Sequence, residues 1–277
     1  MSDLLSSAHV HTTFCDGKSS AKDIAHAAYE KGFVSLGFSS HAPQMFDGAH
    51  CINQSKEEDY KDEIRRLKQE YNGRMAIYLG IERDLFSCSE ADDYEYFIAS
   101  VHYFKTPDGR YIGVDGNSEV LQEYINEYCG GNGFDMAKQY FSLFQDYVCE
   151  SKPSIIGHFD LVRYNNSILH LYDEESLEYR ALALDALRTM RETNALLEVN
   201  TGGVARGYML EPYPAPFLLK EWKAWGGEVI INSDCHDLKL LDAGYGQAID
   251  ILSALGYDHV LRLSSDPSQG MWQTVRL

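Results

Sequence analysis

The feature that most constrains the fold of this chain is a regular alternation of short apolar segments with longer amphipathic ones. After a first strand that leads into His9, strand-like segments are expected at residues 33–38, 75–81, 94–101, 154–157, 195–199, 228–231 and 260–263. Helical spacing of apolar residues occurs between them, at residues 21–31, 56–71, 118–128, 134–149, 173–193, 216–225 and 238–255. This alternation predicts an α/β fold with a parallel sheet. A Pro107-Asp108-Gly109 turn suggests a hairpin or lid at residues 103–115, and residues 270–277 are expected to be a tail.

Side chains that bind metals stand where the expected strands end. They are His9, His11, His41, Glu82, His102, His158, Asp234 and His236, with Asp16 in the first loop. Residues from many parallel strands meet at one face when the sheet closes into a barrel, whereas an open sheet gathers only those near its switch point. No Gly-x-Gly-x-x-Gly turn follows the first strand. We therefore predict a TIM-like barrel with a metal site at the C-terminal face of its strands.

The number of potential ligands exceeds what one ion needs. One metal takes three or four protein ligands, so six histidines and three carboxylates predict two or three metals bridged by carboxylates. Clustered metals are typical of phosphate-ester hydrolysis, because they generate hydroxide near neutral pH and hold the phosphoryl oxygens. A serine hydrolase is disfavoured because the chain has no Gly-x-Ser-x-Gly motif, and a cysteine nucleophile is disfavoured because no glycine loop surrounds Cys235. A metal-binding module without turnover is a further alternative, which so many open ligands disfavour.

The composition limits the classes of molecule that the protein is expected to bind. The net charge of −18 argues against nucleic acid and anionic membranes as partners. The sequence shows neither a long apolar run nor a signal peptide, and its six scattered cysteines are typical of reduced thiols. We therefore expect one cytoplasmic domain over residues 1–277, with a small-molecule substrate. The oligomeric state and the role of residues 103–133 stay open.

Taken together, these motifs resemble the PHP (polymerase and histidinol phosphatase) family, in particular its histidinol-phosphate phosphatase branch. The segments that carry the resemblance are His9-Val10-His11-Thr12, Asp16-Gly17, Ser40-His41-Ala42-Pro43, Gly80-Ile81-Glu82, Ser100-Val101-His102, Ile156-Gly157-His158-Phe159-Asp160, Glu198-Val199-Asn200 and Ser233-Asp234-Cys235-His236. They extend over most of the chain, and together they are specific. The resemblance implies a distorted (β/α)7 barrel with a trinuclear centre of zinc, iron or manganese.

The resemblance also implies a ligand set. One metal would take His9, His11, Glu82 and Asp234; Glu82 would bridge to a second metal held by His102 and His158; Asp16, His41 and His236 would hold the third. Some family members have histidine where this chain has Asp16. The oxygen ligand that Asp16 supplies favours manganese or iron over zinc in the third site. The implied reaction is hydrolysis of L-histidinol phosphate in histidine biosynthesis, with Asp234 or His236 as the acid that protonates the leaving alkoxide.

Recognition of the phosphate group is expected to involve arginine, which pairs with phosphate through two hydrogen bonds. Arg163 and Arg206 both follow strand ends and are the candidates, with Asn200 as a further substrate-binding candidate. Surface ion pairs with nearby acids are the alternative role for both arginines. The main alternative substrates are nucleotides or oligonucleotide ends.

Overall fold

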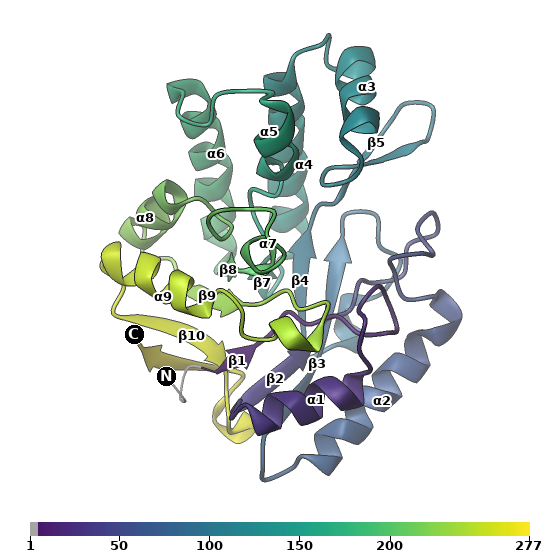
Figure 1. Ribbon diagram of the computed structural model, residues 1–277, viewed down its shortest axis with the longest axis vertical. Helices are drawn as coiled ribbons and strands as arrows, with labels where there is room; N and C mark the ends of the chain where they lie inside the picture. Colours follow the sequence, from purple (N-terminus) through teal and green to yellow (C-terminus); the bar gives the residue numbers. More distant parts are fainter. Residues whose placement is uncertain (1–4) are drawn as a thin grey trace.

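The computed structural model describes residues 5–277, so the first four residues of the predicted domain lie outside it. One mixed sheet dominates (Figure 1), with strands in the order β1-β2-β3-β4-β7-β8-β9-β10-β11. The strands are β1 (Ser6–Ser7), β2 (Ser35–Phe38), β3 (Ala76–Asp84), β4 (Tyr96–Ser100), β7 (Ile155–Ile156), β8 (Leu196–Asn200), β9 (Val229–Asn232), β10 (His259–Leu263) and β11 (Trp272–Arg276). Within this sheet, neighbouring strands pair in parallel up to β10, and only β11 runs antiparallel.

The chain just beyond β1 closes the sheet into a barrel. Val10 forms a parallel bridge with Cys235, which follows β9. The amide of His11 donates to the carbonyl of Cys235, and the amide of Cys235 donates to the carbonyl of His9. The parallel strands β1, β2, β3, β4, β7, β8 and β9 thus form the predicted seven-stranded barrel of the described chain. β10 pairs with β9 and also contacts β1.

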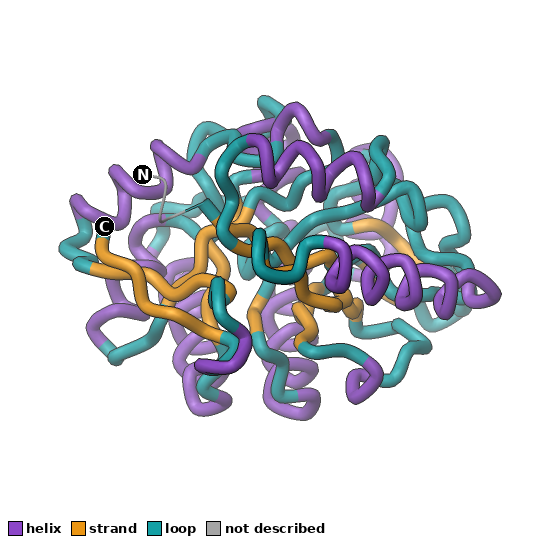
Figure 2. Tube along the Cα trace, turned by 90° about the horizontal axis from the view of Figure 1, so that it is seen from below, coloured by secondary structure: helices purple, strands orange, loops and turns teal. Residues whose placement is uncertain are grey.

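Helices cover the outside of the barrel, as Figure 2 shows from below. The helices of the described chain are α1 (Ala21–Glu30), α2 (Glu57–Glu70), α3 (Ser118–Tyr128), α4 (Gly133–Ser151), α5 (Arg163–Leu169), α6 (Leu177–Met190), α7 (Gly202–Ala205), α8 (Pro216–Ala224) and α9 (Tyr245–Ala254). Of these, α3, α5 and α7 lie at the end of the barrel where the strands end, and the others cover its side (Figure 1). Local sequence sets their ends: the Ser20 hydroxyl caps α1 by accepting from the Asp23 amide, and Gly32, at φ +84°, follows its C-terminus. Among residues 5–277, no helix is both long and apolar enough to cross a membrane.

Below the C-terminal ends of the strands, the barrel encloses an apolar cluster that includes Tyr96, Ile98, Ile155 and Ile230. Tyr96 on β4 lies across the interior, and its hydroxyl donates to the carbonyl of Ala8 at 2.6 Å. A Cβ at Gly37 or Gly80 would lie 2.1–2.2 Å from the Tyr96 side chain, so these strands need glycine where the ring passes. The Tyr96 ring fills this part of the interior, so polar side chains lie at the end where the strands finish.

One local prediction is wrong, and the structure refines others. Residues 270–277 are not a tail, because β11 pairs along the whole of β10. The short helices α5 and α7 were not predicted. His9 and His11 lie just beyond β1, which is only two residues long. The predicted hairpin is present as β5 (Tyr103–Lys105) and β6 (Tyr111–Gly113).

Candidate metal centre

All nine predicted metal ligands come together at the C-terminal end of the barrel strands. Three subsets have ligand atoms within 4.8 Å of one another: His11, Asp16, His41 and His236; His9, His11 and Asp234; and His41, Glu82 and His102. Because the subsets share members, they form one continuous cluster with room for more than one ion.

The deepest part of the cluster is formed by His9, His11, Glu82 and Asp234. The Nε2 atoms of the two imidazoles lie 3.2 and 3.4 Å from Glu82 Oε2, and 3.6 and 3.2 Å from Asp234 Oδ1. A tetrahedral ion with ligand distances of about 2.1 Å separates its ligand atoms by about 3.4 Å. The four imidazole–carboxylate distances are close to this spacing, and His9, His11 and Asp234 form one of the groups of mutually close ligands.

Glu82 lies at the centre of the cluster and faces different histidines with its two oxygens. Its Oε1 lies 3.0 Å from His158 Nε2 and 3.6 Å from His102 Nε2, and it accepts a hydrogen bond from Ser100 Oγ at 2.7 Å. Its Oε2 faces His9 and His11, and also His41 Nδ1 at 2.9 Å. A carboxylate so placed can bridge two cations.

Asp16 lies on the outer side of the cluster and faces three histidines. Its Oδ1 lies 3.3 Å from His236 Nε2, 3.9 Å from His41 Nε2 and 3.7 Å from His11 Nδ1. His41 thus faces Glu82 with one ring nitrogen and Asp16 with the other, so it lies between the inner and outer parts of the cluster.

Several of these atoms are buried with no hydrogen-bond partner: His9 Nε2, His11 Nε2, Asp16 Oδ1, Glu82 Oε2, His102 Nδ1 and His158 Nδ1. A buried polar atom without a partner is costly. Four of these six atoms, His9 Nε2, His11 Nε2, Asp16 Oδ1 and Glu82 Oε2, face other potential ligands at 2.9–3.9 Å. Divalent cations would satisfy them together, so the residues present fit a multinuclear metal site.

The charges of the protein itself oppose one another in the cluster. Burial would lower the pKa of His9, but the carboxylates of Glu198, Glu82 and Asp234 raise it well above its usual value. Burial and the neighbouring His236 and His41 lower the pKa of His11 to about 3. Burial would raise the pKa of Asp234, but Arg206 and nearby histidines hold it well below its usual range. The cluster therefore keeps ionised carboxylates in a buried place, where cations bind best.

Glu198 is a buried residue of the site that the prediction did not include. Its carboxylate accepts four hydrogen bonds, from His9 Nδ1 at 2.7 Å, the His158 amide at 2.8 Å, and the amide groups of Asn200 and Asn232, both at 2.9 Å. The bond from His9 fixes the proton on Nδ1 and leaves Nε2 free to bind a metal. Asp84 similarly lies beside His102, accepting from its amide at 2.6 Å and facing its Nδ1 at 3.4 Å.

Of the three predicted substrate-binding residues, only Arg206 reaches the cluster. Its guanidinium donates to Asp234 Oδ2 at 3.1 Å and to the Asp234 carbonyl at 3.0 Å. Arg163 is instead paired with Asp160 at 3.4 Å and Glu174 at 2.7 Å. Asn200 is fully buried, donates to Glu198 and accepts from the Gly202 amide. The structure therefore places Arg163 and Asn200 in supporting networks and away from the open cavity.

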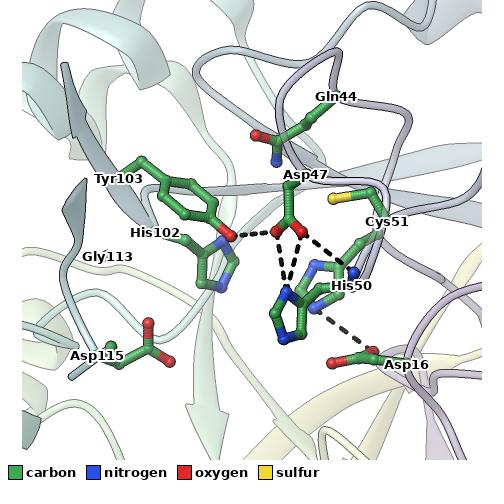
Figure 3. A pocket seen from close by; sticks show the side chains of 11 residues that line it. Asp16, Gln44, Asp47, His50, Cys51, His102, Tyr103, Gly113 and Asp115 are labelled. Carbon is green, nitrogen blue, oxygen red and sulfur yellow. Dashed lines mark hydrogen bonds and ion pairs between the residues drawn. The ribbon is translucent and has the colours of Figure 1, made fainter. Parts of the chain in front are cut away.

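Two adjoining cavities open onto the cluster and share Asp16, His41, His102 and Asp115. The first, of about 390 Å³, is lined on its other side by Lys18, Tyr164, Arg206, Tyr208 and Tyr213 among others; we call it the cationic lobe. The second, of about 320 Å³, is lined by Gln44, Asp47, His50, Cys51 and Tyr103 (Figure 3); we call it the acidic lobe. Together the lobes give a small molecule access to the cluster.

Comparison with known proteins identifies the class of protein that this barrel and cluster define. A family model of the PHP domain matches residues 7–202. The chain therefore belongs to the PHP family.

Individual relatives agree with this assignment. A histidinol-phosphatase of Bacillus subtilis (strain 168) is 29% identical over 262 residues, covering 86% of this chain and 94% of that protein. A histidinol phosphate phosphatase of Lactococcus lactis subsp. lactis, solved in complex with zinc, L-histidinol and phosphate, has a TM-score of 0.64 and 19% identity, covering 95% of this chain and 97% of that one. A structure from Listeria monocytogenes, a candidate histidinol phosphatase, has a TM-score of 0.71 and 17% identity, covering 87% of this chain and 99% of that one. The solved structures support the fold.

Proposed function

We propose that this protein is a metal-dependent phosphomonoesterase that hydrolyses L-histidinol phosphate to L-histidinol and phosphate, acting in the cytoplasm as one domain over residues 1–277. The observation that carries the proposal is the cluster of partnerless buried ligand atoms beside an open cavity. Membership of the PHP family and relatives named histidinol-phosphatase, which match most of the chain, support the choice of substrate.

Three sites share the nine ligands in this proposal. His9, His11, Glu82 and Asp234 form the first; Glu82, His102 and His158 form the second; Asp16, His41 and His236 form the third. The distances around Glu82 and Asp16 support this division. Bound divalent ions would supply hydroxide near neutral pH and charge neutralisation of the phosphoryl oxygens.

The remaining roles fall to side chains at the edge of the cluster. Arg206 lines the cationic lobe beside Asp234, with its side chain 29% exposed, and would bind the phosphate there. Asp234 and His236 border the same lobe and are the two candidates to protonate the leaving alkoxide. Glu198 holds His9 in the tautomer that binds metal.

The test is a substrate panel with metal-loaded protein. Phosphate release should be fastest from L-histidinol phosphate and slower from nucleotides and from oligonucleotides with terminal phosphates. Fastest release from a nucleotide would support the alternative substrate class. Metal binding without release from any of these would support a module that has no turnover.

A further inference from the structure

The two lobes differ in the charged side chains that line them. The cationic lobe is lined by Lys18 and Arg206 in addition to three carboxylates, those of Asp16, Asp115 and Asp234. No lysine or arginine lines the acidic lobe among residues 5–277; its side chains include Asp47 and Asp115. A site that only had to bind a phosphate dianion would gain nothing from carboxylates beside it, because like charges repel. Carboxylates without a lysine or arginine beside them suit a cationic group better than a phosphate group.

Asp115 lies on the boundary between the lobes. It follows β6 and faces Asp16 across the cavity in Figure 3. Its carboxylate makes no hydrogen bond or ion pair with any residue of the described chain, and it borders both lobes. It is thus an open acceptor next to the metal cluster.

Gln44 is a second, independent sign of a ligand in the acidic lobe. Its side chain lines the lobe, only 7% of the residue is exposed, and its Oε1 is buried with no hydrogen-bond partner. A buried amide oxygen without a partner is costly unless a donor from a ligand reaches it. Gln44 therefore offers a neutral acceptor where Asp115 offers a charged one.

The wall around these acceptors is held firmly in place. Asp47 accepts hydrogen bonds from the hydroxyl of Tyr103 and from His50 Nδ1, the latter at 2.9 Å. Phe46 stacks on Tyr111 of the hairpin, with ring centroids 3.5 Å apart and planes 4° from parallel. The loop of residues 42–53 is thus fastened to the hairpin, and the lobe is preorganised for a ligand.

We propose that the acidic lobe binds the alcohol part of the substrate through its positive charge, so that the enzyme selects phosphate monoesters of cationic amino alcohols. Asp115 pairs with the ammonium group, and Gln44 Oε1 accepts a hydrogen bond from an N–H of the same alcohol. The phosphate lies at the metal cluster between the lobes. This inference rests on the proposed phosphatase activity and adds the residues that choose the leaving group.

The test compares two substrates, L-histidinol phosphate and the neutral-alcohol ester p-nitrophenyl phosphate. For Asp115→Asn, the ratio of their kcat/KM values should fall at least about tenfold, as expected for loss of a charged hydrogen bond. Asp92→Asn is the matched control: it removes an exposed carboxylate that precedes β4, at the other end of the barrel, and should leave the ratio unchanged.

Gln44→Leu replaces the amide by a somewhat shorter, apolar side chain. It should raise KM for L-histidinol phosphate more than for the neutral ester, and circular dichroism and metal content would show that the fold is kept. An unchanged ratio in both Asp115→Asn and Gln44→Leu would overturn the inference while leaving the phosphatase activity in place. Absence of phosphate release from either ester by the unaltered protein would instead overturn the proposed function.

Discussion

The metal cluster and the cavity above it are built in different ways. Most of the cluster is carried by residues on or just after the parallel strands, and its central residues are buried: His9 and His11 are fully buried and Glu82 is 1% exposed. The two lobes are lined largely by loops and by the β5–β6 hairpin, and several of their side chains are partly exposed. The barrel thus fixes what can bind a metal, whereas the loops fix what can reach it.

This difference implies that substitutions in the two regions should fail in different ways. A change in the cluster should alter metal content and activity together, because the ligands contact one another: Glu82 faces His9 with one oxygen and His158 with the other. A change in the lobes should alter substrate choice while the metals stay bound. The predictions below test this separation, in order of decreasing expected effect.

The largest effect is expected for Glu82→Ala. Glu82 faces His9, His11 and His41 with one oxygen and His102 and His158 with the other, so its loss removes a ligand from two proposed sites. We expect activity to fall by roughly a thousandfold or more, beyond the 10²–10³ typical of losing one catalytic electrostatic group. Metal analysis should show fewer ions per chain, and circular dichroism a retained fold. Normal turnover would remove Glu82 from the centre.

Glu198→Gln should have the next largest effect. Both oxygens of the carboxylate accept hydrogen bonds, four in all. In glutamine an NH₂ group replaces one of these oxygens, so it would face a hydrogen-bond donor. We expect metal affinity or activity to fall by roughly ten- to a hundredfold, as for other groups that orient a metal-binding histidine. Glu228→Gln is the matched control, since Glu228 pairs with His259 at the surface and lies outside the cluster. Unchanged metal affinity in Glu198→Gln would contradict the role of this residue.

Arg206→Ala tests the cationic lobe. Loss of a charged hydrogen bond to phosphate should lower kcat/KM by about tenfold, with metal content unchanged. Arg163→Ala should behave differently, because Arg163 pairs with the fully buried Asp160 and with Glu174. Its removal leaves the buried Asp160 carboxyl with the Ala215 amide but without its charged partner, so the main effect should be a lower Tm. A purely kinetic defect in Arg163→Ala would restore the original prediction that this arginine contacts phosphate.

A smaller effect concerns pH. Burial would lower the pKa of His102, but the carboxylates of Glu82 and Asp84 raise it to about 10, from an ordinary value of 6.5. A raised pKa stabilises the folded protein fully below pH 6.5, and this contribution disappears as the pH rises towards 10. Chelator-treated protein should therefore lose Tm over this range. Metal-loaded protein should lose less, because a bound cation replaces the proton. A Tm of chelator-treated protein that rises with pH would contradict this reasoning.

The sequence predicted the barrel and its cluster well, because both depend on a repeated local pattern. Each strand ends at a face common to all the others, so a ligand such as Glu82 or His158 could be placed without knowing any loop. Glu198 was missed because it lies inside the expected strand at residues 195–199, whereas Glu82 directly follows the expected strand at residues 75–81; in the structure both lie within strands, β8 and β3. The burial of Glu198 among four hydrogen-bond donors is visible only in three dimensions.

Predictions for the loops were weaker, because they depend on contacts between segments distant in the sequence. Arg163 and Arg206 look alike in the chain, yet Glu174 is near enough to pair with the first, and Asp234 with the second. The sequence also does not predict the backbone of the turn after β9. Asp234 has a φ of +48°, which is unfavourable outside glycine, and the contacts of its side chain hold it there. The acidic lobe depends on the Phe46–Tyr111 stack, which no periodicity reveals.

The most direct test of the central claim is a metal titration of chelator-treated protein with zinc, manganese or iron. Bound ions per chain and phosphate release from L-histidinol phosphate would be measured on the same samples. Nine ligands at three to four per ion, with Glu82 shared, predict roughly three ions per chain at full loading, with phosphate release rising as the sites fill. Full activity with one ion per chain, or full loading without phosphate release, would contradict a trinuclear phosphatase centre.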